Sequence, residues 1–345
     1  MLEIDGSQKS GSGTILRLSV AMSAISLKPL HIYNIRRKRP KPGLKPQHLK
    51  AVHVAAEICN ANTKGVKIGS EELWFFPTKI SGGRYHVEIG TAGSIPMVLM
   101  TVLPICAFAR DPVSIDVSRG GTDVSYSPTI NYLRYVFLPI LGTMGLKTNL
   151  TVHKYGYYPK GLGSISIRIQ PNPKLSPLCL EKFGVLKLLG GVSVCTFLAD
   201  RHVAERQAKA ASNFLRSRGY ECDINIVNDY SNPKQKGSSI TLFAQTDSNV
   251  LIGSDAIGEL RKPSETIGRN AAEDLVREIE ARATVDAHLA DMLIPYMALA
   301  RGESVFLTRS MTDHLETNIL LAQEILEVKF HIDRAGRLYR IEKNE

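Results

Sequence analysis

The feature that most constrains the fold is one order of strands and helices that occurs twice in the first half of the chain. A strand over residues 30–35 and a helix over 47–59 are matched by a strand over 113–117 and a helix over 129–144. The offset between the two copies is 82 residues for the strand that contains His31 and for the helix that begins at Gln47. An equal offset in two elements favours duplication of one structural unit over coincidence.

A third copy of the unit is predicted near the C-terminus. Its elements are a helix over residues 289–300, a strand over 304–307, a helix over 314–325 and strands over 328–333 and 337–341. Units of this kind bury their apolar faces against one another. We therefore expect an α/β fold of the α+β type, in which three repeated units of two helices and four strands form one large domain.

The segment between the second and third copies breaks the pattern. A strand over residues 191–197 is followed there by a helix over 203–218, with further strands and another helix behind it. We expect residues 183–278 to form a smaller inserted α/β domain. The large catalytic domain would then consist of residues 1–182 and 279–345.

The charge balance suggests a polyanionic partner. The 345 residues include 43 Lys and Arg against 33 Asp and Glu, which gives a formal net charge of +10. An excess of this size is typical of proteins that bind RNA, DNA or nucleotides. The alternative is that the whole proteome of the source is basic, since net charge alone also affects solubility and non-specific binding.

The cysteines and the apolar runs indicate a reducing, aqueous compartment. The five cysteines are far apart and form no C-x-x-C pair, which argues against a disulfide framework and a structural zinc site. No signal-peptide pattern opens the chain. The longest apolar run, residues 95–109, is interrupted by two prolines and is too short to span a bilayer. We expect a cytoplasmic protein without membrane contact, and the oligomeric state stays open.

The stretch from Arg309 to Ile319 holds the strongest candidate for chemistry. Apolar residues from Leu315 onward recur at helical spacing, and Asp313 is placed to cap that helix. His314 would then lie in the first helical turn, where backbone N–H groups and the helix dipole attract phosphate. A neutral imidazole beside a bound phosphate is a possible nucleophile on phosphorus. The alternative is a partly exposed histidine in a capped helix turn.

Other stretches offer groups that could bind phosphate or a nucleotide. The basic run from Arg36 to Arg39 directly follows a strand, so it could clamp a polyphosphate or an RNA backbone, or it could be a solvated charge run. The first Gly/Ser loop lacks the Gly-Lys-Ser/Thr ending of a P-loop. His288 and Asp291 would share a helix face and could hold a metal or a nucleotide, although helix capping is the simpler reading. Lys160, in a Gly-containing turn, could contact phosphate or form a hairpin tip.

Taken together, these segments resemble the RNA 3′-terminal phosphate cyclase family from end to end. The matching segments begin at Asp5, Lys41, Ile89, Gly120, Arg201 and Leu289, in the order in which they occur in the chain, and they include His314 with Thr317-Asn318. The resemblance implies three repeated α/β units and an inserted domain. It also implies an RNA with a 3′-terminal phosphate as partner, ATP as nucleotide, and Mg²⁺ or Mn²⁺ as metal.

The resemblance further implies a reaction and a set of residues. The family's histidine attacks the α-phosphorus of ATP, AMP passes to the RNA 3′-phosphate, and the 2′-OH displaces AMP to leave a 2′,3′-cyclic phosphate. His314 matches the nucleophile and Asp291 a carboxylate of the nucleotide site. The matches to phosphate-binding positions are Arg17, Arg36, Arg39 and Gln47. Pro139 matches a residue that flanks the adenine, and His288 and Met292 stand at further nucleotide-site positions.

The chain departs from the family pattern at four of these positions. Ser10 stands where the family has a glutamate associated with the metal, so the metal ligands stay unknown. Met100 and Met292 replace glutamines, and His288 replaces a tyrosine that stacks on adenine. The alternative function is therefore a catalytically weakened member that binds RNA or takes part in ribosomal RNA processing. A third interpretation, from fold analogy alone, is a transferase of the enolpyruvyl type, which the histidine motif disfavours.

Overall fold

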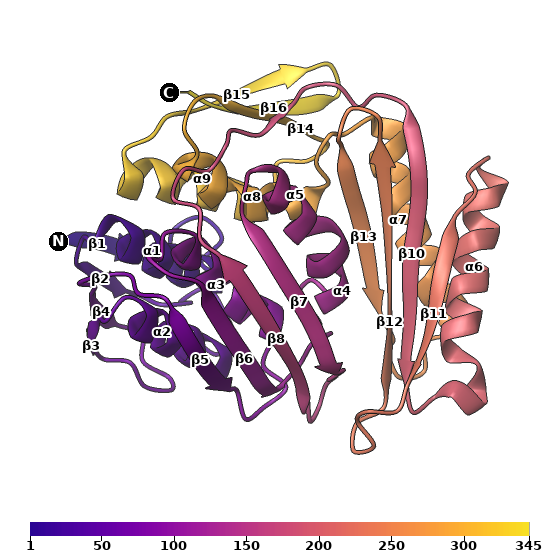
Figure 1. Cartoon of the computed structure of the whole chain (residues 1–345), viewed down its shortest axis with the longest axis horizontal. Coiled ribbons are helices and arrows are strands. Elements are labelled where there is room, and N and C mark those ends of the chain that lie inside the picture. Colours follow the sequence, from indigo (N-terminus) through magenta and orange to yellow (C-terminus); the bar gives the residue numbers. More distant parts are fainter. Residues whose placement is uncertain (345) are drawn as a thin grey trace.

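Three sheets with one common strand order form the large part of the molecule. The structure is a computed structural model, and it describes residues 1–344, within which the strands form four four-stranded sheets (Figure 1). In three of these sheets the first and second strands of a unit are parallel, and the fourth strand pairs antiparallel with both the second and the third. The repeated order confirms the predicted α/β class.

The first two units follow each other along the chain. The first comprises β1 (Leu2–Asp5), α1 (Gly13–Ser26), β2 (Leu30–Tyr33), α2 (Pro46–Ile58), β3 (Asn62–Lys64) and β4 (Leu73–Phe76). The second comprises β5 (Gly83–Glu88), α3 (Ile95–Ala107), β6 (Val113–Gly120), α4 (Ile130–Tyr132), a π-helical turn (Leu133–Phe137), α5 (Leu138–Thr143), β7 (Lys147–Lys154) and β8 (Gly163–Gln170). The sequence analysis did not predict β3 and β4, which are short.

The third unit begins earlier in the chain than the sequence analysis placed it. Its first strand is the two-residue β9 (Cys179–Leu180), which pairs in parallel with β14 (Ser304–Thr308). The remaining elements are α8 (Ala287–Leu299), α9 (Asp313–Leu326), β15 (Phe330–Ala335) and β16 (Leu338–Lys343). A strand of two residues carries too little periodicity to be recognised, so the third copy looked like five elements instead of six.

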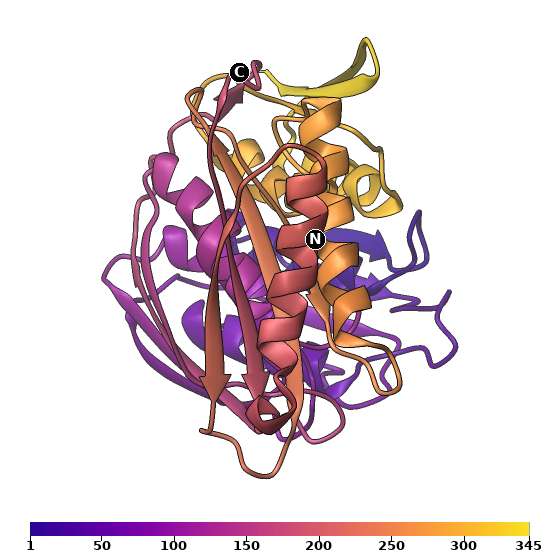
Figure 2. The same ribbon diagram turned by 90° about the vertical axis from the view of Figure 1, so that its right-hand side faces the viewer.

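The inserted segment lies between the first strand and the first helix of the third unit. It contains β10 (Leu186–Thr196), α6 (Val203–Ser217), β11 (Asp223–Asp229), β12 (Gly237–Thr246), β13 (Leu251–Ile257) and α7 (Ser264–Ala281), with a 3₁₀ turn (Ala199–Arg201) before α6. Its sheet has the order β11-β10-β12-β13, which differs from the order of the three repeats. Figure 2 shows α6 and α7 side by side along this sheet.

The helices of the three units pack against one another, and the three sheets lie around them. Helix α1 contacts α2, α3 and α9, and α8 contacts both α3 and α9. The three sheets lie at the left, bottom and top of this bundle in Figure 1, with the insert at the right. Apolar side chains that are at most 2% exposed, among them Leu16, Leu99 and Leu293, fill the space between the helices.

This packing brings helix N-termini from different units together. The longer repeat helices α1, α2, α3 and α9 each follow a strand through a loop, whereas α8 follows α7. Side chains cap α1, α3, α8 and α9, namely those of Ser12, Ser94, Asp286 and Thr312. Helix N-termini present free N–H groups and favour anions. In residues 1–344 we find no helix that is both long and apolar enough to cross a membrane.

Candidate active site

A pocket of about 440 Å³ lies where the three units and the insert meet. Helix α1 contributes Thr14 and Arg17 to its wall, α8 contributes His288, Asp291 and Met292, and α9 contributes His314 and Asn318. Its other lining residues are Met97, Met100, Ser125, Tyr126, Ser127, Pro128, Asp255, Ala256, Ile257 and Glu259. The pocket therefore brings together five of the candidate residues, namely Arg17, His288, Asp291, Met292 and His314.

His314 is held in the first turn of α9, as predicted, but by a different cap. The N-cap is Thr312, whose hydroxyl accepts a hydrogen bond from Leu315 N at 2.9 Å, and Asp313 is the first helical residue. The prediction that Asp313 caps the helix was wrong. Threonine and aspartate are both good caps, and adjacent candidates cannot be ranked by type alone.

The loop before His314 is anchored to the insert and to α8. Arg309 donates through Nη2 and Nε to Glu278 Oε1 on α7, at 2.9 and 3.2 Å. The Thr312 hydroxyl donates to Asp291 Oδ1 at 2.6 Å. These bonds fix the start of α9 relative to the pocket, so the position of His314 is set by contacts from two other helices.

A second set of bonds pins α9 to α1 and α8 one turn beyond His314. Asn318 accepts from Thr14 Oγ1 at 3.1 Å and donates from Nδ2 to Asp291 O at 2.7 Å. Asn318 is buried. The amide thus uses both its acceptor and a donor to hold the three helices that surround His314.

The imidazole of His314 is biased toward its neutral form. Burial lowers the pKa of His314 below its usual value, and the charges of Arg17 and Arg39 lower it further. His314 Nδ1 lies 3.4 Å from Ser12 Oγ, whereas Nε2 has no hydrogen-bond partner among residues 1–344. The lone pair of a neutral ring is therefore available at Nε2 if Nδ1 carries the proton.

Three guanidinium groups gather near His314 without a carboxylate partner. Arg17 lies in the pocket, and Arg36 follows β2 and donates to Lys41 O and Gly43 O at 2.8 Å. Burial and the neighbouring charge of Arg36 lower the pKa of Arg17 to about 10. Burial and then the charge of Arg39 lower the pKa of Arg36. In residues 1–344 no carboxylate lies within salt-bridge distance of the three, so their charge is available to a ligand.

His48 belongs to the same basic group, although the sequence analysis did not single it out as a site residue. It lies in the first turn of α2, where its Nδ1 accepts a hydrogen bond from Lys45 N at 3.3 Å. Burial and the charge of Arg17 lower the pKa of His48 to about 3, so the ring is neutral and Nε2 carries the proton. The Nε2 atom lies against the Cα of Gly13, beside Arg17 Nη1. The signal was present in the sequence, because His48, like His314, lies in the first turn of a helix.

Gln47 links the first unit to the second instead of lining the pocket. Its Oε1 accepts from Ser94 N at 2.8 Å, at the residue that caps α3. Gln47 neighbours His48 at the start of α2, beside the basic group. The predicted role of Gln47 in binding phosphate stays a prediction.

Two carboxylates of the pocket, Asp255 and Asp291, are influenced by His288. Burial raises the pKa of Asp291 to about 6, against the opposing effect of the hydrogen bond from Thr312. Burial also raises the pKa of Asp255, which accepts from Thr129 N at 2.6 Å. The charge of His288 opposes burial and lowers the pKa of both carboxylates. The pocket therefore joins a cationic region with a region of hydrogen-bond acceptors.

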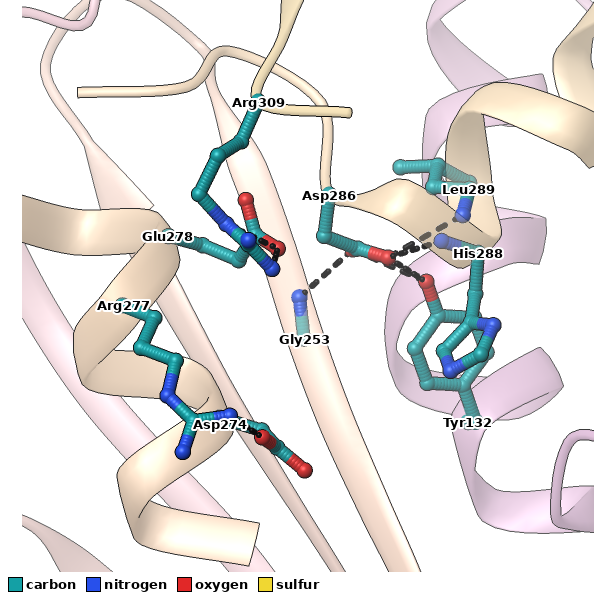
Figure 3. Close-up of polar contacts among 9 residues, drawn as sticks. All are labelled: Tyr132, Gly253, Asp274, Arg277, Glu278, Asp286, His288, Leu289 and Arg309. Atoms are coloured by element: carbon teal, nitrogen blue, oxygen red, sulfur yellow. Dashed lines mark hydrogen bonds and ion pairs between the residues drawn. The ribbon is translucent and has the colours of Figure 1, made fainter. Parts of the chain in front are cut away.

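A buried carboxylate outside the lining holds the His288 side of the pocket together. Asp286 caps α8 by accepting from His288 N and Leu289 N at 3.1 and 3.0 Å (Figure 3). It also accepts from the Tyr132 hydroxyl at 2.7 Å and from Gly253 N at 2.9 Å. One side chain thus joins the second unit, the insert and the third unit.

Pro139 does not lie at this site. It is exposed on α5 and lines a separate depression of about 420 Å³ together with Arg134, Leu138, Gly142 and residues of β7. The proline of the pocket is Pro128, which precedes α4. Pro128 precedes the helical segment that runs from α4 to α5, whereas Pro139 lies inside α5, and only the fold shows which of the two faces the pocket.

Ser10 stands at the position where the resemblance implies a metal-associated glutamate. Ser10 Oγ lies 3.2 Å from Ser12 Oγ, and the Ser10 N–H points to Thr317 Oγ1 at 3.3 Å. In the part of the chain that the structure describes, no group of three or more His, Cys, Asp and Glu side chains is placed to hold a metal ion. The binding of Mg²⁺ or Mn²⁺ and the identity of its ligands stay predictions.

Comparison with known proteins assigns the chain to a family. The family model of the RNA 3′-terminal phosphate cyclases matches residues 8–332. The chain belongs to the RNA 3′-terminal phosphate cyclase family. It is 43% identical to the RNA 3′-terminal phosphate cyclase of Pyrobaculum aerophilum over 99% of this chain and 97% of that protein. It is 44% identical to the RNA 3′-terminal phosphate cyclase of Methanopyrus kandleri, over 96% and 95% of the two chains.

Membership of the cyclase family decides between the cyclase-family interpretation and the enolpyruvyl-type transferase interpretation. The match covers the three repeats and the insert together, so it includes all four parts that line the pocket. The reading as an enolpyruvyl-type transferase rested on fold analogy alone, and family membership sets it aside.

Proposed function

We propose that this protein uses ATP to convert the 3′-terminal phosphate of an RNA into a 2′,3′-cyclic phosphate, through a covalent AMP on His314. The single observation that carries the proposal is a neutral imidazole at a helix N-terminus beside three unpaired guanidinium groups and a pocket. Such a setting both attracts phosphate and leaves a nitrogen lone pair free to attack it.

The first step forms a bond between His314 and phosphorus. The lone pair of the His314 nitrogen attacks the α-phosphorus of ATP, and the bond from that phosphorus to the bridging oxygen breaks. Pyrophosphate leaves with the electron pair. Charge on the equatorial oxygens is spread in such a transfer, and fixed cations stabilise it. Arg17, which lines the pocket, and the N–H groups at the start of α9 are suited to this task.

The later steps transfer AMP and close the ring. An oxygen of the RNA 3′-phosphate attacks the adenylate phosphorus, and the nitrogen–phosphorus bond breaks. The ribose 2′-oxygen then attacks the 3′-phosphorus, its proton passes to solvent, and AMP leaves. A phosphate oxygen is a poor leaving group until it is adenylylated, which explains why ATP is needed. The guanidinium groups of Arg36 and Arg39 are suited to hold the RNA phosphate.

The proposed nucleotide pocket uses apolar and acceptor groups around the base. His288 offers a ring for stacking, although it replaces the family's tyrosine, and it packs edge-on against Tyr132 at 6.5 Å. Met97, Met100 and Met292 offer polarisable apolar contacts. Methionines in place of amides remove hydrogen bonds, which is the observation that favours a catalytically weakened, RNA-binding member as the second candidate function.

A labelling experiment separates the two candidates. The protein is incubated with α-³²P-ATP and run on a denaturing gel, and a 3′-phosphorylated RNA is assayed for a cyclic end. The proposal expects a labelled protein band whose label is lost when the RNA is added. An RNA-binding protein that neither takes up label nor makes cyclic ends would establish the second candidate.

We expect the rate of adenylylation to fall only at pH values below the usual pKa of histidine. Protonated His314 cannot attack, and its pKa is lowered, so the neutral form persists to pH values below about 6.5. Removing a nearby cation with Arg39→Gln should raise this pKa and move the acid limb of the pH–rate profile upward. The charge of Arg39 contributes to the lowered pKa of His314 but not to the pKa of Asp291. A shifted acid limb would therefore identify His314 as the titrating group. An acid limb that stays at the same pH in Arg39→Gln would assign it to another group.

The metal requirement should depend on Ser10. Without a loop carboxylate, Mg²⁺ or Mn²⁺ would be held chiefly by ATP phosphates and water. We expect adenylylation to need a high metal concentration and Ser10→Glu to lower the concentration that gives half-maximal rate. Ser10→Gln is the matched control, because it adds similar bulk without charge. Identical metal titrations for the two variants and the wild type would argue against this placement.

A further inference from the structure

Exposed tyrosines and lysines gather where the β7–β8 hairpin meets the insert. The hairpin tip carries Tyr158 and Lys160, and the turn between β11 and β12 carries Tyr230, Lys234 and Lys236. We call these five residues the seam patch. Tyr158 and Tyr230 are 78% and 63% exposed, although tyrosine rings usually find apolar cover. Figure 1 shows the two turns next to each other at the lower end of the molecule.

The two turns are locked together by hydrogen bonds, so the seam patch is rigid. Gln235 Oε1 accepts from Lys160 N at 3.0 Å, and its Nε2 donates to Tyr158 O at 3.0 Å. The buried Asn232 donates from Nδ2 to Tyr155 O and Gly161 O, at 2.7 and 3.1 Å. Surfaces that are already ordered lose little entropy when a ligand binds.

The lysines of the seam patch have no protein counter-ion. Lys160, Lys234 and Lys236 are exposed, and no carboxylate in residues 1–344 lies within 4 Å of their ammonium groups. The nearest carboxylate along the chain, Asp229, is committed to Thr196 Oγ1 and Ser231 N. The seam patch is therefore cationic as well as aromatic.

A third exposed ring, Tyr126, lies at the rim of the pocket, in the loop between β6 and α4. Tyr126 lines the pocket rim, is fully exposed, and has a backbone φ of 63°, a left-handed conformation that is unfavourable for a bulky residue. Its neighbours are fixed, since Ser127 Oγ lies 2.6 Å from Ser94 Oγ. The loop leaves β6 beside the hairpin, where Thr122 N and Asp123 N both donate to Gly156 O.

A fully exposed ring at the rim suits a ligand that continues out of the pocket. A mononucleotide contained in the pocket would leave Tyr126 uncovered, whereas a polynucleotide with its 3′ end inside must pass over the rim. Bases stack on exposed aromatic rings and phosphates pair with lysines, and this combination is typical of surfaces that bind single strands. We propose that Tyr126 and the seam patch bind the single-stranded RNA upstream of the 3′-phosphate.

This inference rests on the proposed function, because the 3′ end must lie near His314. RNAs of three, eight and sixteen nucleotides with a 3′-phosphate are tested for cyclisation by the full-length protein. In the wild type we expect KM to fall as the RNA lengthens. The triple variant Lys160→Ala, Lys234→Ala, Lys236→Ala should lose this gain, while its adenylylation by ATP and its activity on the trinucleotide stay unchanged.

The dependence of RNA affinity on salt concentration, measured with a matched control variant, also tests whether the seam patch binds RNA. Each single-strand phosphate contact contributes about 0.7 to the slope of log affinity against log salt, so the triple variant should lower the slope by about 2. Lys174→Ala, Lys182→Ala, Lys187→Ala removes the same charge from exposed sites away from the patch. Lys187 lies at the other end of β10, about 30 Å along the strand from the patch. The control should keep the wild-type slope.

The ring at the rim gives a separate readout. Tyr126→Ala should weaken the binding of the longer RNAs about tenfold, and Tyr126→Phe should restore it, because stacking needs the ring and not the hydroxyl. The inference would be overturned if KM fell with RNA length equally in the wild type and the triple lysine variant. It would also be overturned if the control variant lost as much RNA affinity as the triple lysine variant. Direct binding of the RNAs without ATP separates this outcome from a failure of adenylylation.

Discussion

His314→Asn should abolish the covalent adenylate and the cyclic product. Asparagine keeps polarity and approximate size at the second position of α9, but its amide nitrogen has no lone pair that can attack phosphorus. Removal of a nucleophile typically lowers the rate by a factor on the order of 10⁴–10⁶. The variant should still bind ATP and RNA, because Arg17, Arg36 and Arg39 are unchanged. Labelling with α-³²P-ATP and equilibrium binding measure the two properties separately.

The chemical stability of the adduct identifies the bonded atom. A phosphorus–nitrogen bond to histidine is labile to acid and stable to alkali, whereas a phosphate ester of serine is not acid-labile. His288 is the rival histidine, since it lines the same pocket. We expect His288→Ala to weaken nucleotide binding and to leave some adduct. Label that survives in His314→Asn and disappears in His288→Ala would move the nucleophile to α8.

Local patterns in the sequence were sufficient for the repeat and for the place of His314. Helical periodicity behind Leu315 and a short polar residue before it define a helix start within one residue. The cap itself was misassigned, because the choice between Thr312 and Asp313 depends on Asp291, which accepts the Thr312 hydroxyl from a different helix. That contact is long-range and leaves no local signal.

The composition of the pocket could not be predicted from local patterns. Asp255 and Glu259 come from the insert, which the sequence presents as a separate domain, yet they line the same pocket as His314. Pro128 precedes α4 and Pro139 lies inside α5 of the same helical segment, and only the tertiary packing of that segment brings Pro128 and not Pro139 to the site. Periodicity describes one helix or strand at a time, so it cannot predict which residues reach a site through the docking of one domain on another.

Asp286→Ala should destabilise the protein by about 3–5 kcal/mol, because it breaks a buried hydrogen-bond network with several donors. The carboxylate is 2% exposed and accepts from the Tyr132 hydroxyl, from Gly253 N and from two N–H groups at the start of α8 (Figure 3). Alanine leaves these donors buried without an acceptor, at a cost of about 1–3 kcal/mol for a buried group, and also removes the helix cap. Urea unfolding monitored by circular dichroism and by the fluorescence of the single tryptophan measures the loss.

The same substitution should weaken nucleotide binding, because the network sets the position of the His288 side of the pocket. Asp274→Ala is the matched control in the same region, since its carboxylate pairs with Arg277 on the exposed face of α7 (Figure 3). An exposed pair of this kind contributes about 0–1 kcal/mol. Tyr132→Phe removes one donor and should give an intermediate loss. If Asp286→Ala unfolds at the same urea concentration as Asp274→Ala, the carboxylate does not hold the second unit, the insert and the third unit together.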